Sequence, residues 1–216
     1  GLLPDSERLA EVFSDAGLSN DAHIVAYDRA GDAQAARLLY TLDAMGHGAI
    51  SLLDGGLAAW HQAGLALDAG PPQAGASSFA VERQADRIAD REWIMSHLDD
   101  DDVAFLDVRS AAEYAGADVR SARGGHIPGA INLDWNLLKG DDGRLRPRSE
   151  LLQLIADHDI ESERDIVNYC QSHMRSSYTY LVLKHLGFDK VRGYPGAWSD
   201  WGNATDTPVS DTRDAS

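Results

Sequence analysis

The sequence contains an internal repeat, and this feature constrains the fold more than any other. Residues 23–28 match residues 165–170, and both segments are predicted to form short buried strands. Upstream of them, residues 4–7 match residues 147–150, where Pro and Ser typical of a helix start precede an amphipathic pattern. Downstream, each strand leads through a turn into a second helix. We conclude that one unit built of strands and helices has been duplicated.

The second copy of the unit predicts a parallel α/β sheet. Strands alternate with helices along it, and this alternation is typical of strands that run in the same direction and are joined by helical crossovers. The predicted strands cover residues 103–108, residues 130–133, a run ending at residue 169 and a short segment near residue 191, and the predicted helices begin near residues 110, 149 and 175.

The first copy of the unit is incomplete. The material between about residues 78 and 146, including a strand that ends just before Arg109, has no counterpart in it. Half a unit leaves a sheet edge open, and we therefore expect the chain to be a fragment of a longer protein. A segment rich in Gly, Pro, Ala and Ser separates the copies and is predicted to be a linker. The predicted organisation is a partial repeat over residues 1–68, a linker over 69–78 and a complete second domain over 79–216.

The charge and the cysteine content exclude several classes of function. The net charge is -16, from 35 acidic and 19 basic residues, and such a field repels nucleic acid. No run approaches the roughly 18 apolar residues of a membrane span. Cys170 is the one cysteine, so no internal disulfide can form, which is typical of a reducing cytoplasm. We expect a cytoplasmic protein that binds neither nucleic acid nor a membrane.

Cys170 is the candidate reactive residue. It ends a predicted strand, and in parallel sheets ligands bind beyond the carboxyl ends of the strands. The loop that follows it leads into a helix, so that backbone N–H groups can point at the sulfur while Arg175 and His173 add positive charge. These groups favour the thiolate, which is the reactive form of cysteine. From these residues alone, a buried structural cysteine is an equal alternative.

Three segments of the sequence resemble signatures of the rhodanese family. The first is the loop from Cys170 to Arg175, in which Gln-Ser-His is followed by Arg, as in bacterial tandem-domain thiosulfate sulfurtransferases. The others are residues 125–130 (Gly-His-Ile-Pro-Gly-Ala) and residues 193–202, and residues 53–60 resemble the same end signature in the first copy. The resemblance covers nearly the whole chain. It implies rhodanese-like α/β domains, each with a central parallel sheet flanked by helices, of which the first is incomplete and inactive and the second is catalytic.

The resemblance implies a sulfurtransferase that needs no metal and no organic cofactor. Cys170 would take the outer sulfur of a small anionic donor such as thiosulfate as a persulfide and pass it to a thiophilic acceptor such as cyanide or a thiol. Arg109 is expected to hold the anionic part of the donor with its guanidinium group, and the alternative is a surface arginine paired with Asp107 or Glu113. In the first copy Asp28 stands at the position of Cys170, and a carboxylate cannot carry a persulfide. The other predicted substrate-binding residues form the loop itself: Gln171, Ser172, His173, Met174 and Arg175.

Three alternatives stay open at this point. A sulfur-relay or binding module with a protein sulfur donor would retain all of these features. A 3-mercaptopyruvate sulfurtransferase is disfavoured, because such enzymes carry Cys-Gly-Ser-Gly in the loop and a second arginine where this sequence has Glu113. A cysteine phosphatase or arsenate reductase is disfavoured, because its loop needs one more residue between the cysteine and the arginine than separates Cys170 from Arg175.

Other candidate residues have structural interpretations. His126 is predicted to be a turn histidine bonded to the backbone rather than a base. Trp198 and Trp201 are expected to pack the last helix as readily as to wall a pocket. The acidic run at residues 99–102 is predicted to be a solvated turn between a helix and a strand, not a metal site.

Overall fold

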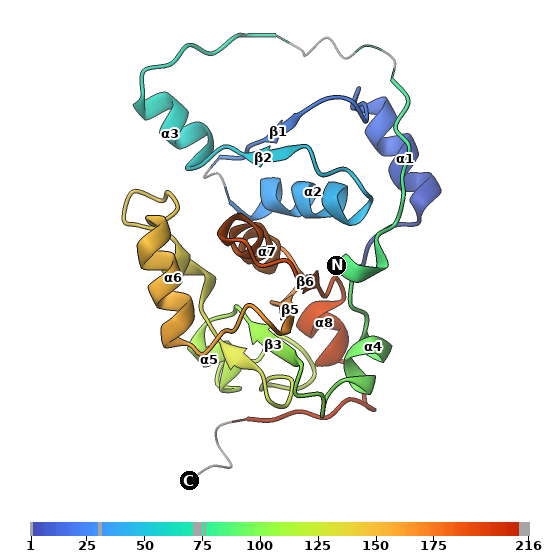
Figure 1. The fold of residues 1–216 in the computed structure, drawn as a ribbon, viewed down its shortest axis with the longest axis vertical. Helices are drawn as coiled ribbons and strands as arrows, with labels where there is room; N and C mark the ends of the chain where they lie inside the picture. The colour runs from blue at the N-terminus through green and yellow to red at the C-terminus, as the bar shows by residue number, and fades with distance from the viewer. Residues whose placement is uncertain (1, 30–31, 71–74, 76, 212–216) are drawn as a thin grey trace. The chain divides into compact units, whose positions relative to one another are not determined.

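The computed structural model describes residues 2–29, 32–70, 75 and 77–211, and Figure 1 shows it as a ribbon. The chain divides into two compact units, Leu3–Ala85 and Asp86–Ser216, which we call the N-terminal unit and the C-terminal unit. Part of the predicted linker, residues 71–74 and 76, lies outside the described residues. Within the described ranges, no helix combines the length and the apolar composition that crossing a bilayer requires.

The N-terminal unit is built on a small parallel sheet. Strand β1 (Ile24–Ala26) pairs in parallel with strand β2 (Ile50–Leu52), and Ile24 lies opposite Ile50. The segment between the two strands contains a helix, because parallel strands require a crossover connection. The helices of this unit are α1 (Ser6–Asp15), α2 (Ala33–Ala44) and α3 (Gly56–Gln62).

The core of the N-terminal unit includes residues that follow the predicted linker. Leu39 of α2 is fully buried. Phe79 packs edge-on against Phe13 with ring centroids 5.0 Å apart, and its backbone N–H donates a hydrogen bond to Ser14 Oγ at 2.9 Å. The compact unit therefore reaches Ala85, whereas the sequence analysis began the second domain at residue 79.

The C-terminal unit contains a four-stranded sheet in which every pairing is parallel. Its strand order is β4 (Ile131–Asn132), β3 (Val103–Asp107), β5 (Asp165–Tyr169) and β6 (Val191–Gly193). Strand β3 is buried along its whole length, as is typical of a parallel strand covered on both faces. The helices of this unit are α4 (Arg91–Ser96), α5 (Ala111–Tyr114), α6 (Arg148–Asp157), α7 (Arg175–Leu186) and α8 (Ala197–Trp201), with the 3-10 turns η1 (Ala85–Arg87) and η2 (Trp135–Leu138).

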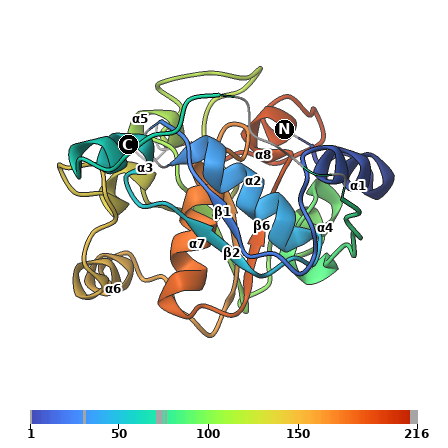
Figure 2. The same cartoon turned by 90° about the horizontal axis from the view of Figure 1, so that it is seen from above.

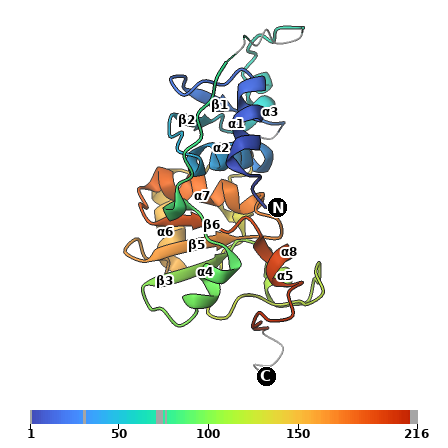
Figure 3. The same ribbon diagram turned by 90° about the vertical axis from the view of Figure 1, so that its right-hand side faces the viewer.

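Helices cover both faces of this sheet. On one face, Phe105 of β3 and Val167 of β5 pack with Ile94 of α4 and Trp198 of α8 in a single buried cluster. Successive residues of a strand point to opposite faces, and α7 contacts β5 and β6 from the other face. Figure 2 shows α7 running alongside β6, and Figure 3 shows α6 and α7 on the same side of the strands. The predicted α/β fold, with parallel sheets flanked by helices, is confirmed.

The register of the central strands brings two predicted site segments to one edge of the sheet. The last residue of β3, Asp107, lies opposite the last residue of β5, Tyr169. The chain leaves both strands at this edge, so Arg109 and Cys170 follow neighbouring strand ends. This is the edge at which parallel α/β sheets place their ligands.

Candidate active site

Cys170 lies immediately after β5, at the carboxyl edge of the sheet. Its side chain is free of any disulfide and only 1% exposed. Ser176 Oγ donates a hydrogen bond to Cys170 Sγ over 3.5 Å. The loop from Cys170 to Met174, which we call the Cys170 loop, ends where α7 begins, at Arg175. The sulfur therefore lies beside the N-terminus of a helix of 12 residues, where the helix dipole favours a negative charge.

Hydrogen bonds hold the Cys170 loop from both sides. The carbonyl of Cys170 accepts a bond from the backbone N–H of Trp198 at 2.9 Å, and the carbonyl of Gln171 accepts one from Ser199 at 2.9 Å. His173 is buried in the left-handed backbone region with φ 59°, a conformation that non-glycine residues seldom adopt. Its ring Nδ1 lies 2.6 Å from Ser176 Oγ. Such a conformation persists only where the surrounding contacts impose it.

Arg175, the first residue of α7, forms a bidentate ion pair with Glu113. Arg175 Nη1 donates to Glu113 Oε2 at 2.7 Å, and Nη2 donates to Oε1 at 2.8 Å. The side chain of Glu113 is 2% exposed and that of Arg175 is 20% exposed. Bidentate pairs of this kind are the strongest charged hydrogen bonds in proteins. The guanidinium group is therefore held in one orientation beside the Cys170 loop.

The electrostatics of this pair follow from its burial and its hydrogen bonds. Burial alone would raise the pKa of Glu113, but the hydrogen bonds and charge of Arg175 outweigh it and lower the pKa to about 2. The hydrogen bonds that Arg175 donates to Glu113 raise the pKa of Arg175, and burial opposes the rise. Glu113 is thus a carboxylate, and Arg175 a cation, throughout the neutral range.

Arg109 lies at the expected edge of the sheet, but its guanidinium group is buried in an ion pair. Its side chain is 1% exposed, and its Nε and Nη2 donate to the carboxylate of Asp107 at 2.5 to 3.0 Å. Nη2 also donates to the carbonyl of Gly125 at 2.7 Å, and the guanidinium lies 4.5 Å from the centre of the Trp198 ring. A buried cation already paired in this way has no face open to a donor in solution. The structure shows the Arg109 guanidinium paired with Asp107 at the sheet edge, and its binding of the donor stays a prediction.

The other predicted residues of the Cys170 loop, Gln171, Ser172 and Met174, are partly buried. Gln171 Nε2 donates to Ser121 Oγ at 3.1 Å and to the carbonyl of Arg120 at 3.3 Å. Arg175 lies at the start of α7, where the Cys170 loop ends, and Arg109 is held in a separate buried pair.

Sequence reasoning did not select Glu113, Arg120 or Ser176 as site residues. The pattern from Ser110 to Glu113 is that of a capping box, and the structure contains this capping box at the start of α5. That local pattern accounts for the start of a helix but not for a pairing with Arg175. The ion pair joins residues that are 62 positions apart in the chain.

The N-terminal unit contains a loop with the same construction, in which a carboxylate replaces the sulfur. Asp28 follows β1 as Cys170 follows β5. Its carbonyl accepts a hydrogen bond from Leu57 N at 2.9 Å, and the carbonyl of Arg29 accepts one from Ala58 N at 3.1 Å, which matches the two bonds from α8 to the Cys170 loop. The carboxylate of Asp28 accepts backbone N–H bonds of 3.0 to 3.1 Å from three residues at and after the loop end: Asp32, Gln34 and Ala35.

Replacing Asp28 with alanine should destabilise the N-terminal unit without altering Cys170. Three backbone N–H groups would lose their acceptor, and by analogy with helix N-caps we expect a loss of about 1 kcal/mol of unfolding free energy. Asp28→Asn should lose less, because the amide oxygen still accepts hydrogen bonds. Denaturant unfolding measures the first effect and the alkylation rate of Cys170 the second. A marked change in that alkylation rate would show that the N-terminal unit participates in the chemistry.

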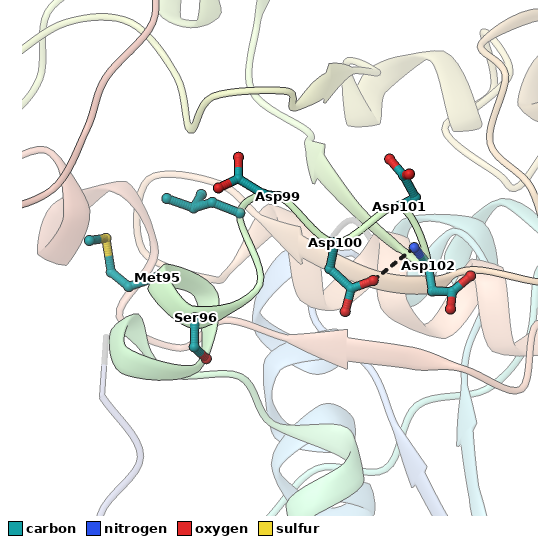
Figure 4. A pocket seen from close by; sticks show the side chains of 7 residues that line it. Met95, Ser96, Asp99, Asp100, Asp101 and Asp102 are labelled. Carbon is teal, nitrogen blue, oxygen red and sulfur yellow. Dashed lines mark hydrogen bonds between the residues drawn. The ribbon is translucent and has the colours of Figure 1, made fainter.

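The hollow drawn in Figure 4 lies at the opposite edge of the C-terminal sheet. Met95, Ser96, Leu98 and the acidic residues 99–102 line it, just before β3 begins. The backbone N–H of Asp102 donates to Asp100 Oδ1 at 3.0 Å, so the acidic run forms a turn. Among the described residues, no group of three or more His, Cys, Asp or Glu side chains is arranged to hold a metal ion. The residues that line this hollow include no cysteine, lysine, arginine or histidine.

Comparison with known proteins identifies the family. The model of the rhodanese-like domain matches residues 2–63 and 90–204. The chain belongs to the rhodanese family. It is 39% identical over 209 residues to a thiosulfate sulfurtransferase of Pseudomonas aeruginosa, covering 97% of this chain and 77% of that protein. It is also 31% identical over 217 residues to the sulfur carrier protein TtuD of Thermus thermophilus, covering 94% of this chain and 76% of that protein.

Solved structures agree with this assignment. The rhodanese fold of SseA from Escherichia coli, described as a 3-mercaptopyruvate sulfotransferase, superposes with a TM-score of 0.82 at 28% identity, over 91% of this chain and 74% of that one. The structure of EanB superposes with a TM-score of 0.87 at 22% identity and shows the fold alone. The chain spans 55% of the length of EanB. The protein is therefore a rhodanese-type sulfurtransferase by sequence and by fold.

Proposed function

We propose that this rhodanese-family protein is a thiosulfate sulfurtransferase in which Cys170 carries sulfur as a persulfide. The observation that supports it most is the position of the chain's one cysteine, at the carboxyl edge of the sheet and beside the start of α7, where Arg175 lies. A cation and a helix N-terminus both favour the thiolate, which is the nucleophile. The similarity to thiosulfate sulfurtransferases supports the choice of donor.

The first half-reaction loads the sulfur. The Cys170 thiolate attacks the outer sulfur of thiosulfate, and a new S–S bond forms at the cysteine. The S–S bond within thiosulfate breaks, and sulfite leaves with its electron pair. The product is a Cys170 persulfide, whose outer sulfur is anionic and needs hydrogen-bond donors around it.

The second half-reaction removes the sulfur. The carbon of cyanide, or the sulfur of a thiolate acceptor, attacks the outer sulfur of the persulfide. A C–S or S–S bond forms to the acceptor, the S–S bond to Cys170 breaks, and the thiolate is regenerated with the electron pair. With cyanide the two halves convert thiosulfate and cyanide into sulfite and thiocyanate, with no change in the protein and with no metal or organic cofactor.

The hydrogen bonds around Asp28 in the N-terminal unit indicate which backbone N–H groups would bind the persulfide at Cys170. There, the anionic carboxylate of Asp28 accepts three backbone N–H groups. The carbonyls of Cys170 and Gln171 accept bonds from α8 as those of Asp28 and Arg29 accept bonds from α3, so the corresponding amides are suited to the anionic outer sulfur of a persulfide. The equivalent amides are those of Met174, Ser176 and Ser177.

Intact-mass measurement tests the first half-reaction. After incubation with thiosulfate, the protein should gain the mass of one sulfur atom, and dithiothreitol or cyanide should remove it. Blocking Cys170 with iodoacetamide beforehand should prevent the gain, because this is the single thiol of the chain. A parent protein that keeps its original mass at high thiosulfate concentration would contradict the proposal.

A sulfur-relay role is a second candidate, supported by the likeness to the sulfur carrier protein TtuD. A relay protein would load sulfur at Cys170 by the same chemistry but pass it to a protein thiol. Release of the loaded sulfur to cyanide would then be slow, and release to a protein acceptor fast. Both roles need a reduced cysteine, and we propose a cytoplasmic location for that reason.

A further inference from the structure

We propose that Arg120 binds the anionic part of the sulfur donor, in place of the buried Arg109. This inference rests on the proposed function and names a residue for one part of it. A thiosulfate dianion must approach a protein whose net charge is -16, so a cation at the site is needed to offset the repulsion. The arginines around the Cys170 loop differ sharply in whether they can supply that cation.

Two of these arginines are committed to the fold. Arg109 is 1% exposed and is bonded to Asp107 and to the carbonyl of Gly125. Arg123 directs its guanidinium at the chain around Thr207, with Nη1 bonded to the carbonyl of Thr207 and Nη2 to that of Trp201 at 2.9 Å. Neither can turn towards a ligand without leaving buried partners unsatisfied.

Arg175 is closer to Cys170, but its charge is already matched. Both of its terminal nitrogens donate to the carboxylate of Glu113, and that carboxylate has a pKa of about 2 and stays ionised. The pair lies at the start of α7, directly after the Cys170 loop. It adds little net charge to attract a dianion, because the two members cancel at a distance.

Arg120 has the exposure, the position and the exchangeable partner that a donor-binding residue needs. Its side chain is 53% exposed, and its Nε lies 3.8 Å from Glu113 Oε1. Its backbone carbonyl accepts a hydrogen bond from Gln171 Nε2 at 3.3 Å, so the residue is tied to the Cys170 loop next to the cysteine. Its other partner, Asp118, lies at 2.7 Å and is 40% exposed. Exposed ion pairs of this kind are weak, and an incoming sulfonate group can replace Asp118.

The test compares Arg120→Ala with Arg144→Ala as a matched control. Arg144 is also exposed, at 46%, and also faces an aspartate two residues earlier, Asp142, but contacts neither Glu113 nor the Cys170 loop. The rate of sulfur loading is measured by intact mass at several thiosulfate concentrations. We expect about a tenfold loss in the second-order loading rate for Arg120→Ala, the effect of one charged hydrogen bond, and no loss for Arg144→Ala. Arg120→Lys should retain part of the rate, because the charge remains.

A second measurement reads the charge at Cys170 without sulfur transfer. Iodoacetate and iodoacetamide alkylate the same thiolate, but only iodoacetate is an anion. Arg120→Ala should lower the ratio of the iodoacetate rate to the iodoacetamide rate severalfold, whereas Asp118→Asn should raise it, because Arg120 is then released.

The outcomes separate the two proposals. Equal loading rates in Arg120→Ala and the parent would overturn the role of Arg120, as would an equal fall in both alkylation rates, which indicates a distorted loop. If the parent takes no sulfur from thiosulfate while its preference for iodoacetate still depends on Arg120, the proposed donor is wrong and the anion-binding role stands.

Discussion

Replacing Cys170 with serine should reduce sulfur transfer from thiosulfate to cyanide to below a few per cent of the parent rate. A serine hydroxyl is a weak nucleophile unless a base activates it, and oxygen cannot hold the transferred sulfur as a persulfide. The nearest donor, Ser176 Oγ, would hydrogen-bond to the new hydroxyl rather than take its proton. Thiocyanate formation under saturating thiosulfate measures the loss.

The controls for this variant concern the fold. Cys170 is 1% exposed, and serine is close to cysteine in size, so the packing around residue 170 should be kept. The denaturant concentration at the unfolding midpoint should therefore stay near that of the parent. Cys170→Ala serves as a second variant that has no hydroxyl at all. If either folded variant retained more than a few per cent of the activity, the sulfur would have to be carried elsewhere and the proposed mechanism would be wrong.

Removing the guanidinium of Arg175 should slow sulfur loading by about ten- to a hundredfold, since the loss of a hydrogen bond to a charged group typically costs roughly 1.5–3 kcal/mol. Arg175 is the cation at the start of α7, directly after the Cys170 loop. In Arg175→Ala the reacting sulfur loses the positive charge of that guanidinium, so iodoacetamide should alkylate Cys170 more slowly than in the parent. The alkylation rate under matched conditions is the direct measurement.

The ion pair with Glu113 makes a second variant necessary. Arg175→Ala leaves a carboxylate that is 2% exposed without its bidentate partner, and this unpaired charge destabilises the fold independently of any effect on the sulfur. The double variant Glu113→Gln with Arg175→Ala removes both charges and should recover stability but not the loading rate. Arg175→Lys should recover only part of the rate, because a point charge cannot reproduce two parallel hydrogen bonds. Identical alkylation profiles in the parent and in the double variant would contradict the electrostatic role.

The fold could be predicted from the sequence because its signals are local and repeated. The run ending at Tyr169 contains the apolar residues of a buried strand, and the helix predicted from Arg175 begins there in the structure. Gly187 ends that helix in the left-handed conformation with φ 95°, which glycine adopts without strain. Each of these features depends on neighbouring residues, and the internal repeat supplied each of them twice.

The contacts of the site were harder to predict because they join distant parts of the chain. Arg109 follows a strand end at the expected edge, but no local pattern shows that its side chain is 1% exposed or that it donates to the carbonyl of Gly125, 16 residues later. Glu113 was noted only as a departure from a related family, although it holds Arg175 in place. Which cation is buried and which is exposed depends on how the loops fold over the sheet edge, and no local pattern encodes that.

The carboxylate of Asp28 has a consequence for how one copy of a duplicated unit can lose its chemistry. A loop shaped around an anionic sulfur loses that anion when the cysteine is lost, and its converging N–H groups would then repel one another and lack acceptors. An aspartate supplies a permanent anion in the same substitution that removes the nucleophile, and its carboxylate accepts three backbone N–H bonds. These donors then have an acceptor that does not depend on the supply of sulfur. A repeat in which aspartate replaces the cysteine can therefore lose sulfur transfer and still keep the hydrogen bonds at its strand end.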